Sequence, residues 1–267
     1  MFNKILELNP IIQALIATLF TYSITALGAS LVYFFKKINK TFMDGMLGFS
    51  AGIMIAASFF SLIMPALDMA NELNIKAWLI VTIGFICGGL LLFIGDKLYD
   101  LYENKNQKKQ KKKSLKRSIM LMLSITLHNI PEGMAVGVAF GSVIYNINGA
   151  NLISAWILAL GIGLQNFPEG TAVSMPLRRE GFSPSKSFFY GQLSGIVEPI
   201  SGIIGALLVI KIRILLPILL AFAAGAMIYV VVEELIPESQ TNKKKDLMAI
   251  FTIIGFSLMM VLDITLG

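Results

Sequence analysis

The sequence predicts an all-α membrane protein with eight membrane-spanning helices, and three observations lead to this prediction. The chain has 267 residues, of which 56% are hydrophobic and 14% are charged, whereas soluble domains carry about 25% charged residues. Its mean hydropathy is +0.76, and apolar runs of about 20 residues, the length that crosses a bilayer, recur along the chain. Basic residues gather between these runs, as in loops at a membrane surface, so nucleic acid is not an expected partner.

The expected spans differ in the polar residues that they contain. The first three and the seventh contain no charged residue, and the eighth carries Asp263 near its end. The fourth, fifth and sixth each contain one glutamate, and the fourth also contains His128, the only histidine. The expected spans are residues 10–35, 45–67, 77–95, 118–144, 152–177, 187–210, 214–232 and 247–266. We expect a single domain, residues 1–267, in which residues 97–117 form a basic cytoplasmic loop.

The distribution of Lys and Arg predicts the orientation in the membrane. Eight spans place both termini on one side, and 18 of the 22 Lys and Arg residues fall in the loops after spans one, three, five and seven. Loops rich in Lys and Arg stay in the cytoplasm. We therefore expect a multi-pass protein of the plasma membrane with both termini outside the cell.

A six-residue pattern occurs twice, as HNIPEG at residues 128–133 and as QNFPEG at residues 165–170, and we call these two segments the boxes. Helix positions four apart share a face, so the first and fifth residues of each box point the same way. Spans four and five are consecutive and therefore antiparallel. The boxes then meet near the middle of the membrane, as in transporters built from inverted repeats. A carboxylate is costly at that depth and is usually functional.

A third intramembrane glutamate, Glu198, is followed by Pro199 in the middle of span six. Pro199 has no N–H, so we expect the carbonyl of Gly195 to lose its helical partner. Three glutamates lie near one cationic candidate, His128, so protons or divalent cations must balance their charge. Imidazole, amides and carboxylates form a donor set suited to Zn²⁺, Cd²⁺, Mn²⁺ or Fe²⁺, without a thiolate pair because Cys87 is the only cysteine.

Other interpretations of these residues stay open. Asn and Gln in spanning helices also hold neighbouring helices together through hydrogen bonds. His128 considered alone is compatible with a structural histidine whose ring nitrogens have hydrogen-bond partners. A proton-coupled carrier or channel for another solute would use the same glutamates as proton sites. An intramembrane metal-dependent hydrolase would need a motif such as His-Glu-x-x-His, which this sequence lacks. Unpaired carboxylates in mid-membrane argue against a structural scaffold.

The boxes and a third motif, GQLSGIVEP at residues 191–199, make the sequence resemble the ZIP (ZRT/IRT-like) family of divalent metal transporters, in particular its GufA-like bacterial branch. The resemblance covers essentially the whole chain. It implies an inverted-repeat architecture and uptake of a divalent cation, zinc first, by alternating access in which one helix bundle slides against another. It also implies a homodimer, no enzymatic activity and no catalytic cofactor, because the bound metal ion is the substrate.

The resemblance further implies a binuclear metal centre midway through the membrane. The first metal would be held by His128, Glu132, Gln165 and Glu169 with Met54 nearby, and the second by Asn129, Glu132, Asn166, Glu169 and Glu198. Residues that resemble the family's transport path toward the outside are Ser61, Asp68 and Asp263. Toward the cytoplasm the family often has His-Glu where this chain has Glu233 and Glu234, so release there is expected to rely on carboxylates. Core packing of Met54 and an ordinary solvated charge at Asp68 or Asp263 are the alternatives. Relatives often have Asp in place of Asn166, so the second position here lacks one negative charge.

Overall fold

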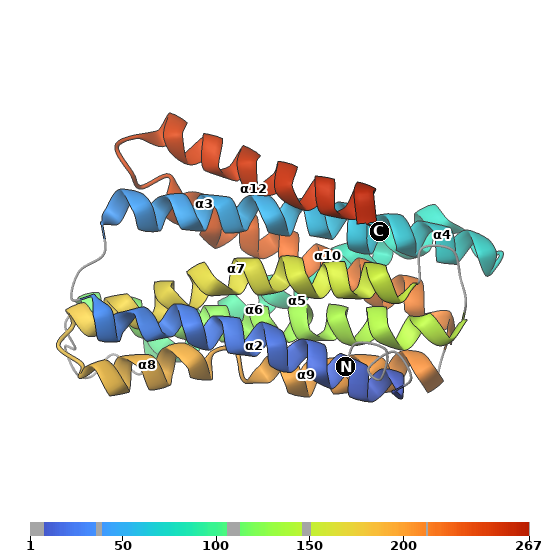
Figure 1. Ribbon diagram of the computed structural model, residues 1–267, viewed down its shortest axis with the longest axis horizontal. Helices are drawn as coiled ribbons and strands as arrows, with labels where there is room; N and C mark the ends of the chain where they lie inside the picture. Colours follow the sequence, from blue (N-terminus) through green and yellow to red (C-terminus); the bar gives the residue numbers. More distant parts are fainter. Residues whose placement is uncertain (1–7, 36–38, 106–112, 146–150, 212, 267) are drawn as a thin grey trace.

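Helices make up all of the regular secondary structure in the residues that the computed structural model describes, which are 8–35, 39–105, 113–145, 151–211 and 213–266 (Figure 1). The predicted all-α class is therefore confirmed for these residues. Six of the described helical stretches are long and apolar enough to cross a membrane. They are Pro10–Phe34, Lys40–Glu72, Ala77–Gly95, Pro184–Ile210, Leu216–Ser239 and Lys245–Thr265. The helices that carry the boxes, α6 (Lys113–Ser142) and α7 (Leu152–Arg179), have similar lengths and more polar residues.

Asparagine side chains fix where several helices begin. Asn9 accepts a hydrogen bond from the N–H of Ile11 at 2.9 Å and so caps α2 (Pro10–Phe34). Asn39 caps α3 (Lys40–Ala57) in the same way, at 2.8 Å. Such caps satisfy N–H groups in the first turn that have no partner inside the helix. The short polar segments between apolar runs thus determine the helix starts.

The long helices pack in pairs. The pairs are α2 with α7, α6 with α9 (Val197–Lys211), α3 with α12 (Lys245–Leu266), and α5 (Ala77–Lys105) with α10 (Leu216–Val230). Glycines lie where the helices of a pair cross. A Cβ at Gly170 would overlap the carbonyl of Thr25, and one at Gly137 would overlap that of Gly202. Small residues let helix backbones approach closely in a membrane, where van der Waals packing replaces the hydrophobic driving force.

These pairs form two groups of helices. The first group contains α2, α6, α7, α9 and the short α8 (Pro184–Leu193), and the second contains α3, α5, α10, α12 and the short α4 (Met64–Glu72). Figure 1 shows α3 and α12 along one edge of the molecule and α2, α8 and α9 along the opposite edge. The groups meet where α3 packs on α7 and where α10 packs on α6. The start of α2 and the end of α12 lie toward the same end of the bundle (Figure 1).

Two helices of the second group contain a π-helical turn immediately before a proline. The segment η1 (Ser58–Ile63) comes before Pro65, and η4 (Val231–Leu235) comes before Pro237. In each, the N–H of the residue preceding the proline bonds to a carbonyl five residues earlier. A proline cannot donate to the preceding turn, and the wider turn accommodates this missing bond. Such wide turns are frequent at functional sites.

Span six is not one continuous helix, in contrast to the prediction. A turn at residues 194–196 separates α8 from α9. Pro199 therefore lies in the first turn of α9, where a helix needs no internal N–H donor. The carbonyl of Gly195 keeps a partner, the N–H of Glu198 at 3.1 Å, so the expected loss of its hydrogen bond is wrong.

The ends of other helices also differ from the expected spans. α5 continues to Lys105 and α6 begins at Lys113, so much of the expected loop at residues 97–117 is helical. Lys, Glu and Gln are good helix formers, which allows both helices to extend beyond their apolar parts. The seventh span extends past its expected end at residue 232 through η4 and α11 (Ile236–Ser239). The glutamates at positions 233 and 234 therefore lie within this span rather than after it.

The close glycine contacts generate a stability prediction for α5. A Cβ at Gly88 would overlap the carbonyl of Phe222 on α10, whereas a Cβ at Gly95 meets nothing within 4 Å. We expect Gly88→Ala to destabilise the protein by about 1–3 kcal/mol, as overpacked sites do. Gly95→Ala should leave stability unchanged or raise it slightly, because alanine favours the helix. Melting curves of both variants in one detergent check this, and equal melting temperatures would contradict the α5–α10 contact.

Candidate metal centre

The boxes lie within α6 and α7, well away from the ends of both helices, and these helices pack on each other. Five of their polar side chains are at most 3% exposed: Asn129, Glu132, Gln165, Asn166 and Glu169. The backbone of the sixth expected residue, at position 128, belongs to α6, and its side chain lies outside the described part of the structure. The five buried side chains define the described part of the site.

Hydrogen bonds and charge interactions connect the boxes. Gln165 donates from Nε2 to Glu132 Oε1 at 2.6 Å, which links α7 directly to α6. The carboxyl group of Glu132 lies close enough to those of Glu169 and Glu198 for their charges to interact. Glu169 interacts in the same way with Glu198 and with Glu234 of η4. Carboxyl groups from both helix groups thus lie near enough to one another for their charges to interact.

The box amides all use their nitrogen atoms as hydrogen-bond donors. Asn129 donates from Nδ2 to the carbonyl of Ser194 at 2.9 Å, and Asn166 donates from Nδ2 to both carboxylate oxygens of Glu198, at 2.9 and 3.0 Å. Gln165 donates to the other box, so each amide is held by its nitrogen. The box oxygens that are buried without a hydrogen-bond partner are Asn129 Oδ1, Glu132 Oε2, Gln165 Oε1, Asn166 Oδ1 and Glu169 Oε2.

Five unpartnered oxygens in one buried region require an explanation, because burying such an atom costs about 1–3 kcal/mol. Amide oxygens and ionised carboxylates accept hydrogen bonds and bind cations. Divalent metal ions accept both kinds of oxygen. Among the described residues, no three His, Cys, Asp or Glu side chains are grouped so as to hold a metal ion. The geometry therefore fits a divalent cation only if amide oxygens complete the set of carboxylates.

Glu198 enters this region from the first turn of α9. Its carboxylate accepts hydrogen bonds from the Thr21 hydroxyl of α2 and from Asn166 of α7. A negative side chain at a helix N-terminus is favoured by the helix dipole. The turn before α9 also supplies the Ser194 carbonyl that binds Asn129. The break in span six thus positions one carboxylate and one amide of the site.

Hydroxyl residues that the sequence analysis did not identify also contact the site. Thr21 binds Glu198, and Ser50 of α3 donates to the carbonyl of Gln165 at 3.0 Å. Threonines at positions 18, 21 and 25 form one buried face of α2. This polar face in an apolar span is the signal that could have identified Thr21. Ser50 has a weaker signal, because a single serine in a spanning helix is common.

Met54 lies on α3 one turn beyond Ser50 and is 1% exposed. It belongs to the hydrophobic core. Ser58 lies one further turn along and has a buried hydroxyl without a partner. Ser50, Met54 and Ser58 therefore form a buried stripe that leads from the boxes toward η1.

Ser61 and Asp263 lie together beyond this stripe. The Ser61 hydroxyl donates to Asp263 Oδ1 at 2.7 Å and so joins η1 to α12. The second carboxylate oxygen of Asp263 is buried without a hydrogen-bond partner. Asp68 lies exposed on α4, as an ordinary solvated charge would.

The two expected exit glutamates have different surroundings. Glu233 is exposed, whereas Glu234 is half-buried, although both belong to η4. Glu234 is the one whose charge interacts with Glu169. The structure thus brings one of the two close to the boxes and leaves the other at the surface.

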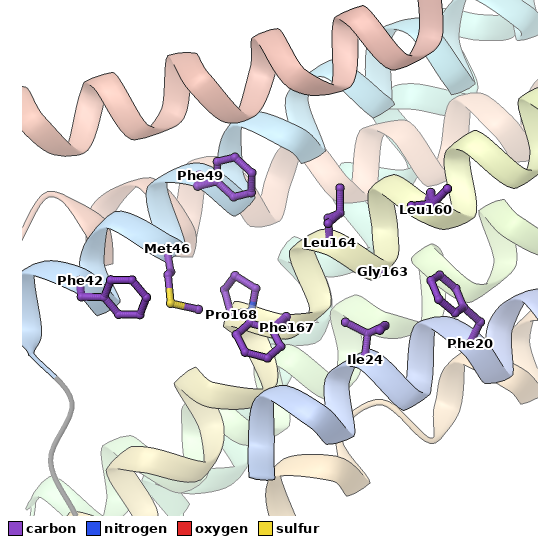
Figure 2. Close-up of a pocket in the computed structure, with 10 residues that line it drawn as sticks. All are labelled: Phe20, Ile24, Phe42, Met46, Phe49, Leu160, Gly163, Leu164, Phe167 and Pro168. Atoms are coloured by element: carbon purple, nitrogen blue, oxygen red, sulfur yellow. The ribbon is translucent and has the colours of Figure 1, made fainter. Parts of the chain in front are cut away.

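An apolar crevice of about 380 Å³ separates α3 from α2 and α7 beside the second box. Figure 2 shows Phe42, Met46 and Phe49 of α3 across from Phe167 and Pro168 of that box. All of the lining residues are apolar, so the crevice offers no ligand to a cation. It marks the seam between the two helix groups rather than the metal site.

Comparison with known proteins connects this arrangement to a family. The family described as ZIP Zinc transporter matches residues 101–263, which include both boxes and Glu198. Zinc transporter ZIP11 of Xenopus tropicalis is 39% identical over 332 residues, covering 97% of this chain and 98% of that protein. Zinc transporter ZIPB of Bordetella bronchiseptica is 37% identical over 250 residues, covering 92% of this chain and 79% of that protein. Zinc transporter GufA of Myxococcus xanthus is 34% identical over 257 residues, covering 95% and 98%. By its boxes, its buried oxygens and these similarities, the chain belongs to the ZIP zinc transporter family, on the side of its GufA-like bacterial members.

Proposed function

We propose that this chain transports divalent metal ions across the plasma membrane into the cell, with zinc as the main substrate. The observation that carries the proposal is the set of five buried box oxygens without hydrogen-bond partners. Membership in a family whose relatives are named zinc transporters supports zinc as the substrate. Neutral amide oxygens bind cations weakly, and several weak ligands suit an ion that must also be released.

In the proposed first metal position, Glu132, Gln165 and Glu169 act together with the imidazole of His128 as the nitrogen ligand. Two carboxylates balance the charge of one divalent ion, so the bound complex is neutral in a region shielded from water. Met54 lies on the adjacent face of α3. The second position implied by the resemblance would draw on Asn129, Asn166 and Glu198, which already take part in hydrogen bonds.

The proposed route uses the polar groups on either side of the boxes. Asp68 and Asp263 attract the cation at the outer end, since clefts lined by negative charge concentrate cations. The free oxygen of Asp263 and the hydroxyl of Ser61 lie at the start of the buried stripe. Glu234 and then Glu233 receive the ion on the cytoplasmic side.

Alternating access is the proposed transport cycle, with one helix group sliding against the other. Backbone contacts at glycines occur within the groups, as between Gly170 and Thr25 or Gly137 and Gly202. In the described residues, the glycine that faces the other group is Gly161, whose Cβ would meet the flexible side chain of Met259. Rigid groups with a side-chain interface between them suit a sliding motion.

The proposed topology has eight spans with both termini outside the cell. The distribution of Lys and Arg supports the orientation, and the placement of the helix ends in Figure 1 supports an even number of spans. The chain is proposed to work as a homodimer and to need no catalytic cofactor, as the family resemblance implies.

Uptake by proteoliposomes tests the proposed metal site. We expect Glu169→Ala and His128→Ala to lower the initial rate of Zn²⁺ uptake by more than about tenfold, because even partners of metal ligands contribute 10–100-fold to affinity or activity. Asp246→Ala is the matched control, since Asp246 lies exposed at the start of α12. It should transport as the wild type does.

Uptake that is unchanged in both box variants, with normal melting temperatures, would sink the site assignment. The same vesicles distinguish a metal carrier from a proton carrier. A pH-sensitive dye should report no proton flux when Zn²⁺ is absent if the glutamates serve the metal. Metal-independent proton flux that Glu169→Ala abolishes would favour the proton carrier instead.

The crevice in Figure 2 provides a test of sliding. In a Cys87→Ala background, Met46→Cys on α3 and Leu164→Cys on α7 place one thiol in each helix group. Bridging them with a short bis-methanethiosulfonate, which forms a disulfide with each thiol and releases methanesulfinate, should stop Zn²⁺ uptake, and reduction of the disulfides should restore it. Phe20→Cys with Leu160→Cys is the control pair, because both residues line the crevice within the first group. Full uptake after complete bridging across the groups would refute the sliding motion.

A further inference from the structure

The buried oxygens around the boxes fall into two sets that differ in their hydrogen bonds. Oxygens of Asn129, Glu132, Gln165, Asn166 and Glu169 lack partners. Both oxygens of Glu198, in contrast, accept hydrogen bonds from Asn166 Nδ2, and Oε2 also accepts from the Thr21 hydroxyl. Glu198 is 0% exposed, and its charge interacts with that of Glu132. Both of its oxygens are nevertheless already hydrogen-bonded within the protein.

The orientation of the Asn166 amide is determined by its surroundings. Its Nδ2 faces three acceptors, which are the two oxygens of Glu198 and the carbonyl of Thr21 at 3.4 Å. The reversed amide would place Oδ1 against those three oxygens, which would repel it. The NH₂ group therefore points at Glu198, in the place from which a cation would bind that carboxylate. Asn166 Oδ1 points elsewhere and has no partner.

Charge balance leads to the same conclusion. Glu132 and Glu169 together neutralise one divalent cation, and N–H and O–H dipoles from Asn166 and Thr21 offset the charge of Glu198. A second divalent ion would bring two positive charges without counter-charge into a region shielded from water, which is costly. An aspartate at position 166 would instead place a second carboxylate opposite that of Glu198. Two carboxylates so close need a cation or a proton between them.

We propose that this chain binds one divalent metal ion per protomer at the boxes, and that Glu198 is a positioning residue rather than a metal ligand. Glu198 holds the Asn166 amide in one orientation and joins α2 and α9 to the box helix α7. The neutral amide of Asn166 takes the role that a second cation would have beside Glu198. This inference rests on the proposed metal transport and specifies how many ions its site holds.

Counting bound ions tests the inference. The full-length protein in detergent is titrated with Cd²⁺ or Zn²⁺, native mass spectrometry counts the ions per protomer, and calorimetry measures the affinity. We expect one ion for the wild type and one for Glu198→Gln, whose side-chain oxygen still accepts from Thr21. Affinity in Glu198→Gln should fall by about 10–100-fold at most, as for other residues that orient ligands. Glu169→Gln is the matched control of the same shape, and it should lose the ion at concentrations that saturate Glu198→Gln.

Asn166→Asp tests the role of the amide directly. It adds a carboxylate facing Glu198, so we expect the count to rise from one ion to two. Two ions in the wild type, falling to one in Glu198→Gln, would overturn the inference. One bound ion in Asn166→Asp would also overturn the inference, because the amide of Asn166 would then not be the reason why a second ion does not bind. No bound ion in the wild type would instead refute the proposed transport function.

Thr21 separates positioning from simple packing. Thr21→Val keeps the side-chain volume and removes the hydroxyl that binds Glu198, whereas Thr21→Ser keeps the hydroxyl. We expect Thr21→Val to weaken Cd²⁺ binding by about tenfold without changing the count, and Thr21→Ser to bind as the wild type does. Melting temperatures monitor packing in parallel. Equal losses of affinity in the two variants would assign Thr21 to packing and contradict its role in positioning.

Discussion

The hydrogen bonds donated by the box amides determine the rest of the site. Gln165 donates to Glu132, Asn129 to the Ser194 carbonyl, and Asn166 to Glu198. Each of these bonds engages the nitrogen of an amide and leaves its oxygen without a partner. A carboxylate accepts at both oxygens, so the same bonds also decide which glutamate oxygens stay free. The suitability of the region for the proposed cation thus depends on how its donors are used, as much as on how many glutamates it contains.

These donors need acceptors at fixed positions, and the helix packing provides them. The Ser194 carbonyl is available because α8 ends just before it, and Glu198 is in reach because α9 starts three residues later. Glycines hold the participating helices close: a Cβ at Gly133 would meet the backbone of Glu198. Replacing small residues along α6 or α9 would therefore move a carboxylate as well as a helix. In this part of the molecule, the packing of the helices therefore also determines where the side chains of the site lie.

The sequence predicted the all-α class correctly, because long apolar runs are a strong local signal. It also drew attention to the two boxes and Glu198, because intramembrane carboxylates are rare, and the glutamates at these positions are buried in the structure. It did not predict the break in span six, since Ser and Gly are tolerated inside spanning helices and do not by themselves end one. Nor did it identify Thr21, whose role depends on α2 packing against α9, a contact between residues 177 positions apart. Hydrogen-bond direction at Asn166 was equally out of reach, because residue type gives the donors and not their partners.

The site also lies at the boundary between the two helix groups, and this has a consequence for transport. Ser50 of the second group donates to the carbonyl of Gln165 in the first, and Glu234 of the second interacts with Glu169 of the first. A relative movement of the groups changes both interactions, one with the backbone of the box and one with a proposed ligand. In the proposed transport cycle, a bound cation would screen the repulsion between the charges of Glu169 and Glu234 and so favour the arrangement in which the two charges interact. Because a ligand shifts an equilibrium only by its differential affinity for the two states, the proposed cycle would couple ion binding to the position of the groups through these contacts across the boundary.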